Sequence, residues 1–342
     1  MKWLSAILLS SLLFIASGCA HAPKADAERA DLSFFAMDTY ISMTAYGKGG
    51  QDALQKAETF ISQAERRLST TDPDSEIYRI NHRENPSSPV SPDTEKLLQF
   101  SLSMADKTDG VLNPAMYPIT LAWGFTTDHN QIPSEDTISQ LLPRTNYKEI
   151  SIKDHQVTLA PGMEIDLGAT AKGYTGQEAA DLLKKEGIQS AILNLGGNVQ
   201  TIGAKPDGSP WRVGLQSPWG HEYLGILTVK DMAIVTSGSY QRFFKGEDGR
   251  IYHHIMDPAT GRPAESGLVS ATIITKDGGL ADALSTALFI KGKDKSIQYW
   301  RDHPDFDMIL ITDDRTLYIT KSIADHFTLD DAFKDLKVNI IS

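Results

Sequence analysis

Cysteine, basic charge and long apolar runs are all scarce in this sequence. Its 342 residues include one cysteine, Cys19, which excludes a scaffold held together by internal disulfides. Asp and Glu outnumber Lys and Arg by 44 to 33, and the net charge of −11 argues against a nucleic-acid-binding protein. The apolar run at residues 4–15 is shorter than the roughly 20 residues that a membrane-spanning helix needs. An anionic ligand would need local help from a Lys, backbone N–H groups or a metal ion.

The N-terminus has the pattern of an export signal. Lys2 precedes the apolar run, and the small residues Ser17 and Gly18 precede Cys19. This arrangement resembles a bacterial lipobox, in which Cys19 becomes the lipidated first residue. We therefore expect a signal peptide at 1–18 and a lipid-anchored tether at 19–31. The protein would be exported and held on a bacterial membrane, facing the periplasm or the cell exterior. The alternative is an ordinary cleaved signal with an incidental cysteine.

The rest of the chain is typical of one α+β domain at 32–342. Its hydrophobic content of 41% is enough for a sizeable core, and no composition shift marks a further boundary. Helical spacing of apolar residues predicts helices at 51–68, 95–107, 134–141, 174–186, from 280 onward and at 295–301. Apolar β-branched runs predict strands at 32–46, 191–195, 211–216, 223–229, 233–236, 251–256 and 268–275, with hairpins at 149–159 and 308–320. Clustered strands with interspersed helices favour largely antiparallel sheets.

A first candidate site lies where the strand at 268–275 meets the following helix. Asp282 and Thr286 are four residues apart, so they share one face of that helix. A carboxylate and a hydroxyl are hard oxygen ligands that suit Mg²⁺. The alternative is that Asp282 caps the helix and Thr286 donates back to a helix carbonyl.

A second candidate is the glycine-rich stretch at 166–173. Gly168 and Gly173 would let the backbone approach a ligand closely. Lys172 and the N-terminus of the helix after it would favour a phosphate group, and Asp166 would accept a hydrogen bond from a ligand N–H or hydroxyl. The alternative is a plain glycine turn with a solvated Lys172.

A pair of histidines, His253 and His254, ends a predicted strand. Adjacent residues of a strand point to opposite faces, so these two are poorly placed to ligate one metal together. One of them, facing a cleft, would serve as a general base. The alternative is a pair of packed or solvated histidines.

Taken in order, the short motifs of this chain resemble the ApbE family from residue 32 to the C-terminus. They are AMDTY (36–40), LST (68–70), DSEI (74–77), DG (109–110), WGF (123–125), DLGATAKG (166–173), NLGG (194–197), TSGSY (236–240), HIMDPATGRP (254–263) and ADALSTA (281–287). That family consists of FAD:protein FMN transferases, often periplasmic lipoproteins. The resemblance implies cleavage of the pyrophosphate of FAD, transfer of the FMN half to a Thr or Ser of a target flavoprotein, and release of AMP.

The resemblance also implies roles for individual residues. The metal ligands would be Asp282, Thr286 and the backbone carbonyl of Ala169, with Mg²⁺ as the cofactor. FAD, the substrate, would contact Met37, Val111, Leu112, Asn113, Asp166, Lys172 and Ile255. The catalytic groups would be His254 or Asp257, which would take the proton of the acceptor hydroxyl, and Lys172, which would neutralise phosphoryl charge. The expected partners are acceptor proteins such as membrane-bound respiratory flavoprotein subunits.

Two departures from the family pattern keep other functions open. Many members have an aromatic residue where this chain has Thr71, and a Thr cannot stack on the isoalloxazine ring. Tyr40 or Trp123 would have to take over that role. Asp38 stands where Gly is commoner. The alternatives to FMN transfer are a Mg²⁺-dependent FAD pyrophosphatase that yields AMP and FMN, and a non-catalytic FAD-binding lipoprotein.

Overall fold

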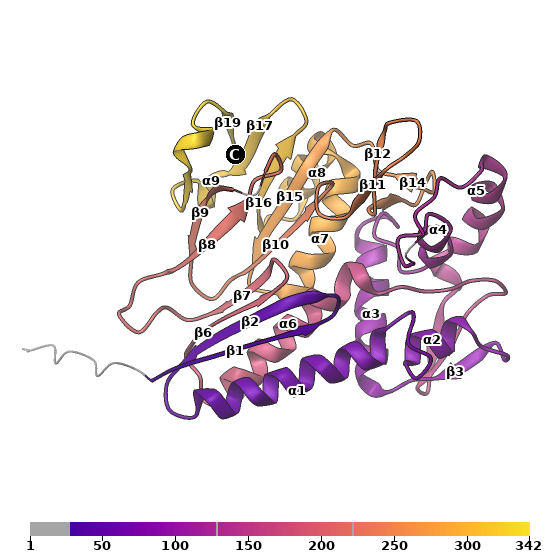
Figure 1. Cartoon of the computed structure of the whole chain (residues 1–342), viewed down its shortest axis with the longest axis horizontal. Helices are drawn as coiled ribbons and strands as arrows, with labels where there is room; N and C mark the ends of the chain where they lie inside the picture. Colours follow the sequence, from indigo (N-terminus) through magenta and orange to yellow (C-terminus); the bar gives the residue numbers. More distant parts are fainter. Residues whose placement is uncertain (1–27, 128, 221) are drawn as a thin grey trace, which may run out of the picture.

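A nine-stranded sheet runs through the computed structural model, which describes residues 28–127, 129–220 and 222–342 (Figure 1). In spatial order its strands are β1 (Arg29–Ala36), β2 (Thr39–Tyr46), β6 (Ser190–Leu195), β7 (Asn198–Ile202), β10 (Ala233–Gly238), β15 (Leu268–Thr275), β16 (Asp307–Thr312), β17 (Thr316–Thr320) and β19 (Lys337–Ile341). Neighbouring strands are antiparallel except β17 and β19, which are parallel. The predicted α+β class with largely antiparallel sheets is confirmed.

The central strands of the sheet are buried on both faces. Helices α1 (Gly50–Leu68), α6 (Gly168–Lys185) and α7 (Gly278–Lys291) cover one of them. On the other lies a small sheet made of β8 (Trp211–Gln216), β9 (Tyr223–Val229) and β18 (Phe327–Leu329). The alternation of β16 shows this directly: Met308 and Leu310 pack under α7, whereas Ile309 and Ile311 join the core beneath the small sheet.

The remaining elements form a lobe beside the helices and the rim of the main sheet (Figure 1). The lobe contains α2 (Glu76–Asn81), β3 (Ser87–Pro89), α3 (Pro92–Lys107), α4 (Tyr117–Ala122), α5 (Glu135–Leu141), η1 (Leu142–Thr145), η2 (Tyr147–Glu149), β4 (Ser151–Lys153) and β5 (Gln156–Thr158). The later elements are β11 (Phe243–Lys245), β12 (Ile251–His253), β13 (Met256–Asp257), β14 (Arg262–Pro263), α8 (Lys293–Asp302), α9 (Lys321–Ala324) and η3 (Asp331–Phe333).

The strand predicted at 32–46 is in fact a hairpin of β1 and β2. Its two turn residues, Met37 and Asp38, have φ angles of 54° and 56°. A two-residue hairpin turn with positive φ at both central residues is the type I′ geometry, which favours Gly, Asn and Asp. Asp38 is thus one of the residue types that this turn tolerates. The turn is hard to predict here because neither residue is a glycine.

Other boundaries also differ from the prediction. Helix α6 begins at Gly168, so the glycine-rich stretch forms the first turns of the helix instead of leading into it at 174. The strand predicted at 251–256 is interrupted between β12 and β13. Strand β7 follows directly after the NLGG turn and was not predicted.

The N-terminal expectations mostly fall outside the described residues. The signal peptide and Cys19 lie in the undescribed segment 1–27, and β1 already begins at Arg29, inside the expected tether. Among the residues that the structure describes, no helix combines the length and the apolar character of a membrane span.

Helices α6 and α7 cross at two glycines. A Cβ added to Gly173 would lie 2.2 Å from the carbonyl oxygen of Gly278 and 2.4 Å from Cβ of Asp282. Neither position has room for even a methyl group, because real Cβ atoms do not approach a backbone oxygen so closely. The absence of side chains at Gly173 and Gly278 therefore sets the distance between the two helices.

Replacing Gly173 with Ala should lower the free energy of unfolding by about 1–3 kcal/mol, because the added methyl group overpacks the helix crossing and forces backbone shifts. Gly176→Ala, in the same helix, is the matched control. Its Cβ would lie 3.3 Å from Cγ of Gln200, a flexible side chain, and Ala gains about 0.5–1 kcal/mol over Gly inside a helix. Denaturant unfolding of both variants measures the difference. Equal stabilities would contradict a steric limit at this crossing.

Candidate functional site

Asp282 lies in the second turn of α7 and is only 7% exposed. Its Oδ2 atom accepts a hydrogen bond of 2.7 Å from the backbone N–H of Gly173 in α6. The cap of α7 is a different residue, Asp277, whose side chain accepts from the N–H of Leu280 at 3.0 Å. The alternative in which Asp282 caps the helix is therefore wrong.

The hydrogen bond to Asp282 also affects the carbonyl of Ala169. In a regular α-helix the N–H of residue 173 donates to the carbonyl of residue 169. Here the N–H of Gly173 donates to Asp282 of the neighbouring helix. A carbonyl oxygen has two lone pairs, so that of Ala169 has capacity for another partner beside any helix bond. The predicted ligand role of Ala169 is compatible with this arrangement.

Burial makes it unfavourable for the carboxyl group of Asp282 to ionise. Its pKa is raised to about 6 by burial, against the opposing effects of Lys172 and the Gly173 N–H. A buried carboxylate with one hydrogen-bond donor and a nearby Lys retains affinity for a further cation.

The donor set fits Mg²⁺. Asp282, Thr286 and the Ala169 carbonyl offer one carboxylate, one hydroxyl and one carbonyl oxygen, and Mg²⁺ completes such partial sets with water and phosphate oxygens. In the described part of the chain, no three His, Cys, Asp or Glu side chains lie close enough together to hold a metal ion. The described residues therefore contain no site of the kind that is typical of zinc.

Thr286 does not donate back to its own helix, as the second alternative supposed. Its Oγ1 lies 3.1 Å from Oγ of Ser237, at the end of β10. Ser237 belongs to the TSGSY motif, but sequence analysis assigned it no role, because only the packing of β10 beneath α7 brings it to Thr286.

Lys172 connects the predicted motifs. It lies in the second turn of α6, half-buried, and its charge opposes the rise in the pKa of both Asp166 and Asp282 while lowering that of His254. No salt bridge of Lys172 is found among the residues that the structure describes. Its ammonium group is thus available to an anionic ligand.

Asp166 stands at the start of α6. Its Oδ1 accepts a hydrogen bond of 2.7 Å from the N–H of Gly168, while burial raises the pKa of its carboxyl. Its own N–H donates to the carbonyl of Pro114 at 2.8 Å. Asp166 therefore joins the helix start to Pro114, next to the 111–113 stretch, and within the described part of the chain Oδ2 has no hydrogen-bond donor.

His254 follows β12, and its ring is half-buried. Both its Nδ1 and its backbone N lie 3.1 Å from the carbonyl oxygen of Arg242. A carbonyl only accepts, so Nδ1 carries the proton and Nε2 is left as a base. Burial, together with the charges of Arg242 and Lys172, lowers the pKa of His254 to about 4. The ring is therefore neutral at physiological pH, as a general base must be.

His253 has a structural role. Its Nε2 donates to the carbonyl of Ala264 at 3.1 Å, its Nδ1 accepts from the N–H of Ile255 at 3.3 Å, and its ring meets the ring of Phe289 edge-on. Both nitrogens are thus satisfied inside the core. The packed-histidine alternative holds for His253, whereas His254 keeps a free nitrogen.

Arg242 is a site residue that sequence analysis missed. Its carbonyl positions His254, its charge opposes the rise in the pKa of Asp166 that burial causes, and its guanidinium donates to the carbonyl of Phe125. The motif TSGSY stops two residues before it, and no spacing rule connects Arg242 to Asp166. Only the tertiary structure brings these two groups together.

Of the residues predicted to contact FAD, one lies in the β1–β2 turn and three belong to the core around α7. Met37 lies in the β1–β2 turn, where Oε1 of Glu65 accepts its N–H at 2.7 Å. Leu112 and Ile255 are 2% and 5% exposed, and both belong to the core around α7, where Val111 packs against them. These core residues can meet a ligand chiefly through their backbone.

The side chain of Asn113 forms hydrogen bonds within the protein. Its Nδ2 donates to the carbonyl of Thr145 at 2.8 Å, and its Oδ1 accepts from the N–H of Ala115 at 2.9 Å. The side chain therefore fixes the loop between α3 and α4, and its part in FAD binding stays a prediction.

The structure also gives the positions of Asp257, Trp123 and Thr71. Oδ1 of Asp257 accepts from the N–H of Ala259 at 2.9 Å and so builds its own turn. Trp123 is fully buried and donates to the carbonyl of Gly261 at 2.9 Å, so its ring has no exposed face for stacking. Thr71 is exposed in a turn with Ser69.

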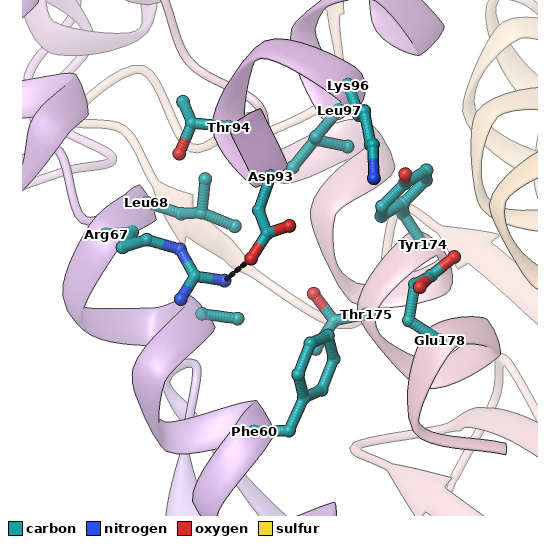
Figure 2. Close-up of a pocket in the computed structure, with 11 residues that line it drawn as sticks. Phe60, Arg67, Leu68, Asp93, Thr94, Lys96, Leu97, Tyr174, Thr175 and Glu178 are labelled. Atoms are coloured by element: carbon teal, nitrogen blue, oxygen red, sulfur yellow. Dashed lines mark ion pairs between the residues drawn. The ribbon is translucent and has the colours of Figure 1, made fainter. Parts of the chain in front are cut away.

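A small pocket lies elsewhere, between α1, α3 and α6 (Figure 2). Arg67 and Asp93 form an ion pair of 3.5 Å across it, and Phe60, Tyr174 and Glu178 complete its walls. Its interior of about 40 Å³ is far below the about 300–1,000 Å³ of typical ligand pockets. None of the predicted FAD or metal residues lines it.

Comparison with known proteins agrees with this geometry. The model of the ApbE family matches residues 37–310. This chain belongs to the ApbE family. It is 33% identical over 300 residues to the FAD:protein FMN transferase of Treponema pallidum (strain Nichols), with 82% of each chain covered. It is 30% identical over 308 residues to that of Escherichia coli (strain K12), with 85% of this chain and 87% of the relative covered.

Solved structures of the family share the fold. The ApbE protein of Thermotoga maritima superposes with a TM-score of 0.78 at 30% identity, covering 91% of this chain and 99% of that one. The flavin transferase ApbE of Vibrio cholerae gives 0.76 at 25% identity, again covering 91% and 99%. The resemblance inferred from the motifs is confirmed.

The ring of His254 should remain neutral down to about pH 5, since its pKa lies at about 4. In the unfolded chain the pKa of a His is about 6.5, so the unfolded state takes up the proton first as the pH falls. The stability due to this group should fall as the pH drops from about 6.5 to about 4. An NMR titration of ¹⁵N-labelled histidine nitrogens measures the pKa, with His254→Gln to assign the signal. Titration of His254 near pH 6.5 would contradict the burial argument.

Proposed function

We propose that this ApbE-family protein transfers the FMN moiety of FAD to a Thr or Ser hydroxyl of a target flavoprotein, with Mg²⁺ held by Asp282, Thr286 and the Ala169 carbonyl. The observation that carries the proposal is the position of Lys172. Its charge acts on Asp166, Asp282 and His254, which come from three separate motifs. Flavin transfer is the activity in the names of the relatives compared above.

In this reaction Lys172 and His254 have separate roles. Lys172 binds the phosphoryl oxygens of FAD and neutralises part of their charge. Nε2 of His254 accepts the proton of the acceptor hydroxyl as its oxygen bonds to the FMN phosphorus, and the bond to the AMP oxygen breaks. General-base help of this kind is worth about 10²–10⁴-fold. A bound Mg²⁺ would supply further stabilisation of charge on the pyrophosphate oxygens. Asp257 as the base stays a prediction.

FAD pyrophosphatase activity is the second candidate, because water could replace the acceptor hydroxyl. The feature that favours it is Thr71, which cannot stack on a flavin, while Trp123 is buried. Tyr40, the other aromatic residue expected to take over this role, is 64% exposed beside the β1–β2 turn. A binding protein without catalysis is disfavoured, since it has no use for a buried carboxylate beside the pyrophosphate.

The proposal extends to cellular location. Lipidation of Cys19 would hold the domain at a bacterial membrane on the exported side. The acceptors would then be membrane-bound respiratory flavoprotein subunits, which present their hydroxyl on the same side. The pattern of residues 2–19 supports this placement.

Asp282→Asn should reduce FMN transfer at least about 10²-fold, because metal stabilisation of phosphoryl charge is worth several kcal/mol. The test incubates the protein with FAD, Mg²⁺ and candidate acceptor proteins, and follows both AMP release and the mass of FMN on an acceptor Thr. Asp277→Asn is the matched control, because Asn also caps helices well and the change leaves the predicted ligands intact. Full transfer by Asp282→Asn would rule out the metal role.

The same assay separates the two enzyme functions. Release of AMP and free FMN over many turnovers, without any labelled acceptor, would favour the pyrophosphatase. Thr71→Tyr should then shift the products toward labelled acceptor, because an aromatic ring can stack on the flavin and shield the site from water. No change in the product ratio would remove Thr71 from the explanation.

A further inference from the structure

Three hydroxyl groups form a continuous chain between β10 and α7, which lie side by side (Figure 1). Oγ1 of Thr286 lies 3.1 Å from Oγ of Ser237. Oγ of Ser237 lies 2.9 Å from Oγ of Ser285. Oγ of Ser285 donates to the backbone carbonyl of Asp282 at 2.8 Å. The chain thus begins and ends at the two residues predicted to hold the metal through their side chains.

The direction of this chain follows from counting protons. The carbonyl of Asp282 has no proton, so the hydroxyl of Ser285 must donate to it. Ser285 has then used its one proton and accepts from Ser237. Ser237 donates its proton to Ser285, so it can only accept a hydrogen bond from Thr286. All three hydroxyl protons therefore point away from Oγ1 of Thr286.

We propose that Ser237 is a positioning residue that holds the hydroxyl of Thr286 as a lone-pair donor for the divalent cation. A hydroxyl ligates a cation through its oxygen lone pairs, so its proton has to lie on the other side. Ser237 accepts that proton on the side of β10 and leaves the lone pairs of Thr286 facing away from the strand. The inference rests on the metal site of the proposed function.

Without Ser237, Thr286 would have a competing arrangement. A Thr inside a helix commonly donates to the carbonyl three or four residues earlier, here Ala283 or Asp282. That rotamer turns the hydroxyl back along its own helix. Ser285 is fully buried and fixes the proton of Ser237, so the alternative hydrogen bond, from Ser237 to Thr286, is disfavoured as well.

The test is a titration of the protein with Mn²⁺ alone, in which free Mn²⁺ is measured by its electron paramagnetic resonance signal. Removing a group that orients a metal ligand typically costs about 10–100-fold in affinity. Ser237→Ala should weaken Mn²⁺ binding by that factor, and Ser237→Thr, which keeps the hydroxyl, should restore it. Ser239→Ala is the matched control, because Ser239 belongs to the same segment and its hydroxyl is directed to the carbonyl of Val269.

A second variant, Ser285→Ala, tests the direction of the chain. Ser285 does not bond Thr286, yet its loss frees the proton of Ser237 to compete for the lone pairs of Thr286. Mn²⁺ affinity should therefore fall in this variant too, while the midpoint of thermal unfolding without metal stays close to that of Ser239→Ala. This variant also keeps the test decisive if Ser237→Ala folds poorly.

The outcomes distinguish the inference from the proposed function. Wild-type affinity in Ser237→Ala and Ser285→Ala, alongside loss of binding in Asp282→Asn, would overturn the role of Ser237 and leave the metal site standing. Equal Mn²⁺ binding by the wild type and Asp282→Asn would overturn the metal site and the inference together. Weaker binding in both serine variants, with rescue by Ser237→Thr, would support the positioning role.

Discussion

The close crossing of α6 and α7 is the constraint on which the site depends. Because Gly173 and Gly278 carry no side chains, the two helices approach until the N–H of Gly173 reaches the carboxylate of Asp282. Two segments 109 residues apart in sequence are thereby joined by one hydrogen bond. That bond offsets part of the cost of burying Asp282. A bulkier residue at the crossing would separate the two groups of predicted ligands.

Around this crossing the protein arranges charge for an anionic substrate, although its net charge is −11. Burial raises the pKa of Asp166 and of Asp282, and Lys172 opposes that rise at both. At His254, burial and the same Lys172 act in one direction and keep the ring neutral. A single lysine therefore supports two carboxylates and a neutral base at once. Overall charge says little about such a site, because local burial and a few neighbours decide its electrostatics.

Features encoded in short sequence segments could be predicted. The helix at Gly50–Leu68 follows from its 3.6-residue spacing of apolar residues, and the shared face of Asp282 and Thr286 follows from their separation of four. The hairpin turn at Met37 and Asp38 could not be predicted so easily, because positive φ at residues other than Gly leaves little trace in composition. The sequence places the start of α6 too late because the glycines of 166–173 have low helix propensity, whereas the hydrogen bond from Gly168 to Asp166 and packing against α7 favour the helix.

The sequence by itself determined the family, the order of the motifs and the type of chemistry, since these depend on residue identity and local spacing. Only the tertiary structure decided which of two adjacent histidines is free: His253 has partners for both ring nitrogens in the core, whereas His254 keeps Nε2 unbonded. It alone brought Arg242 to His254 and Ser237 to Thr286. The reason is physical: the proton position on a ring or hydroxyl is set by partners across strands and helices, and those partners follow from packing that no local pattern contains.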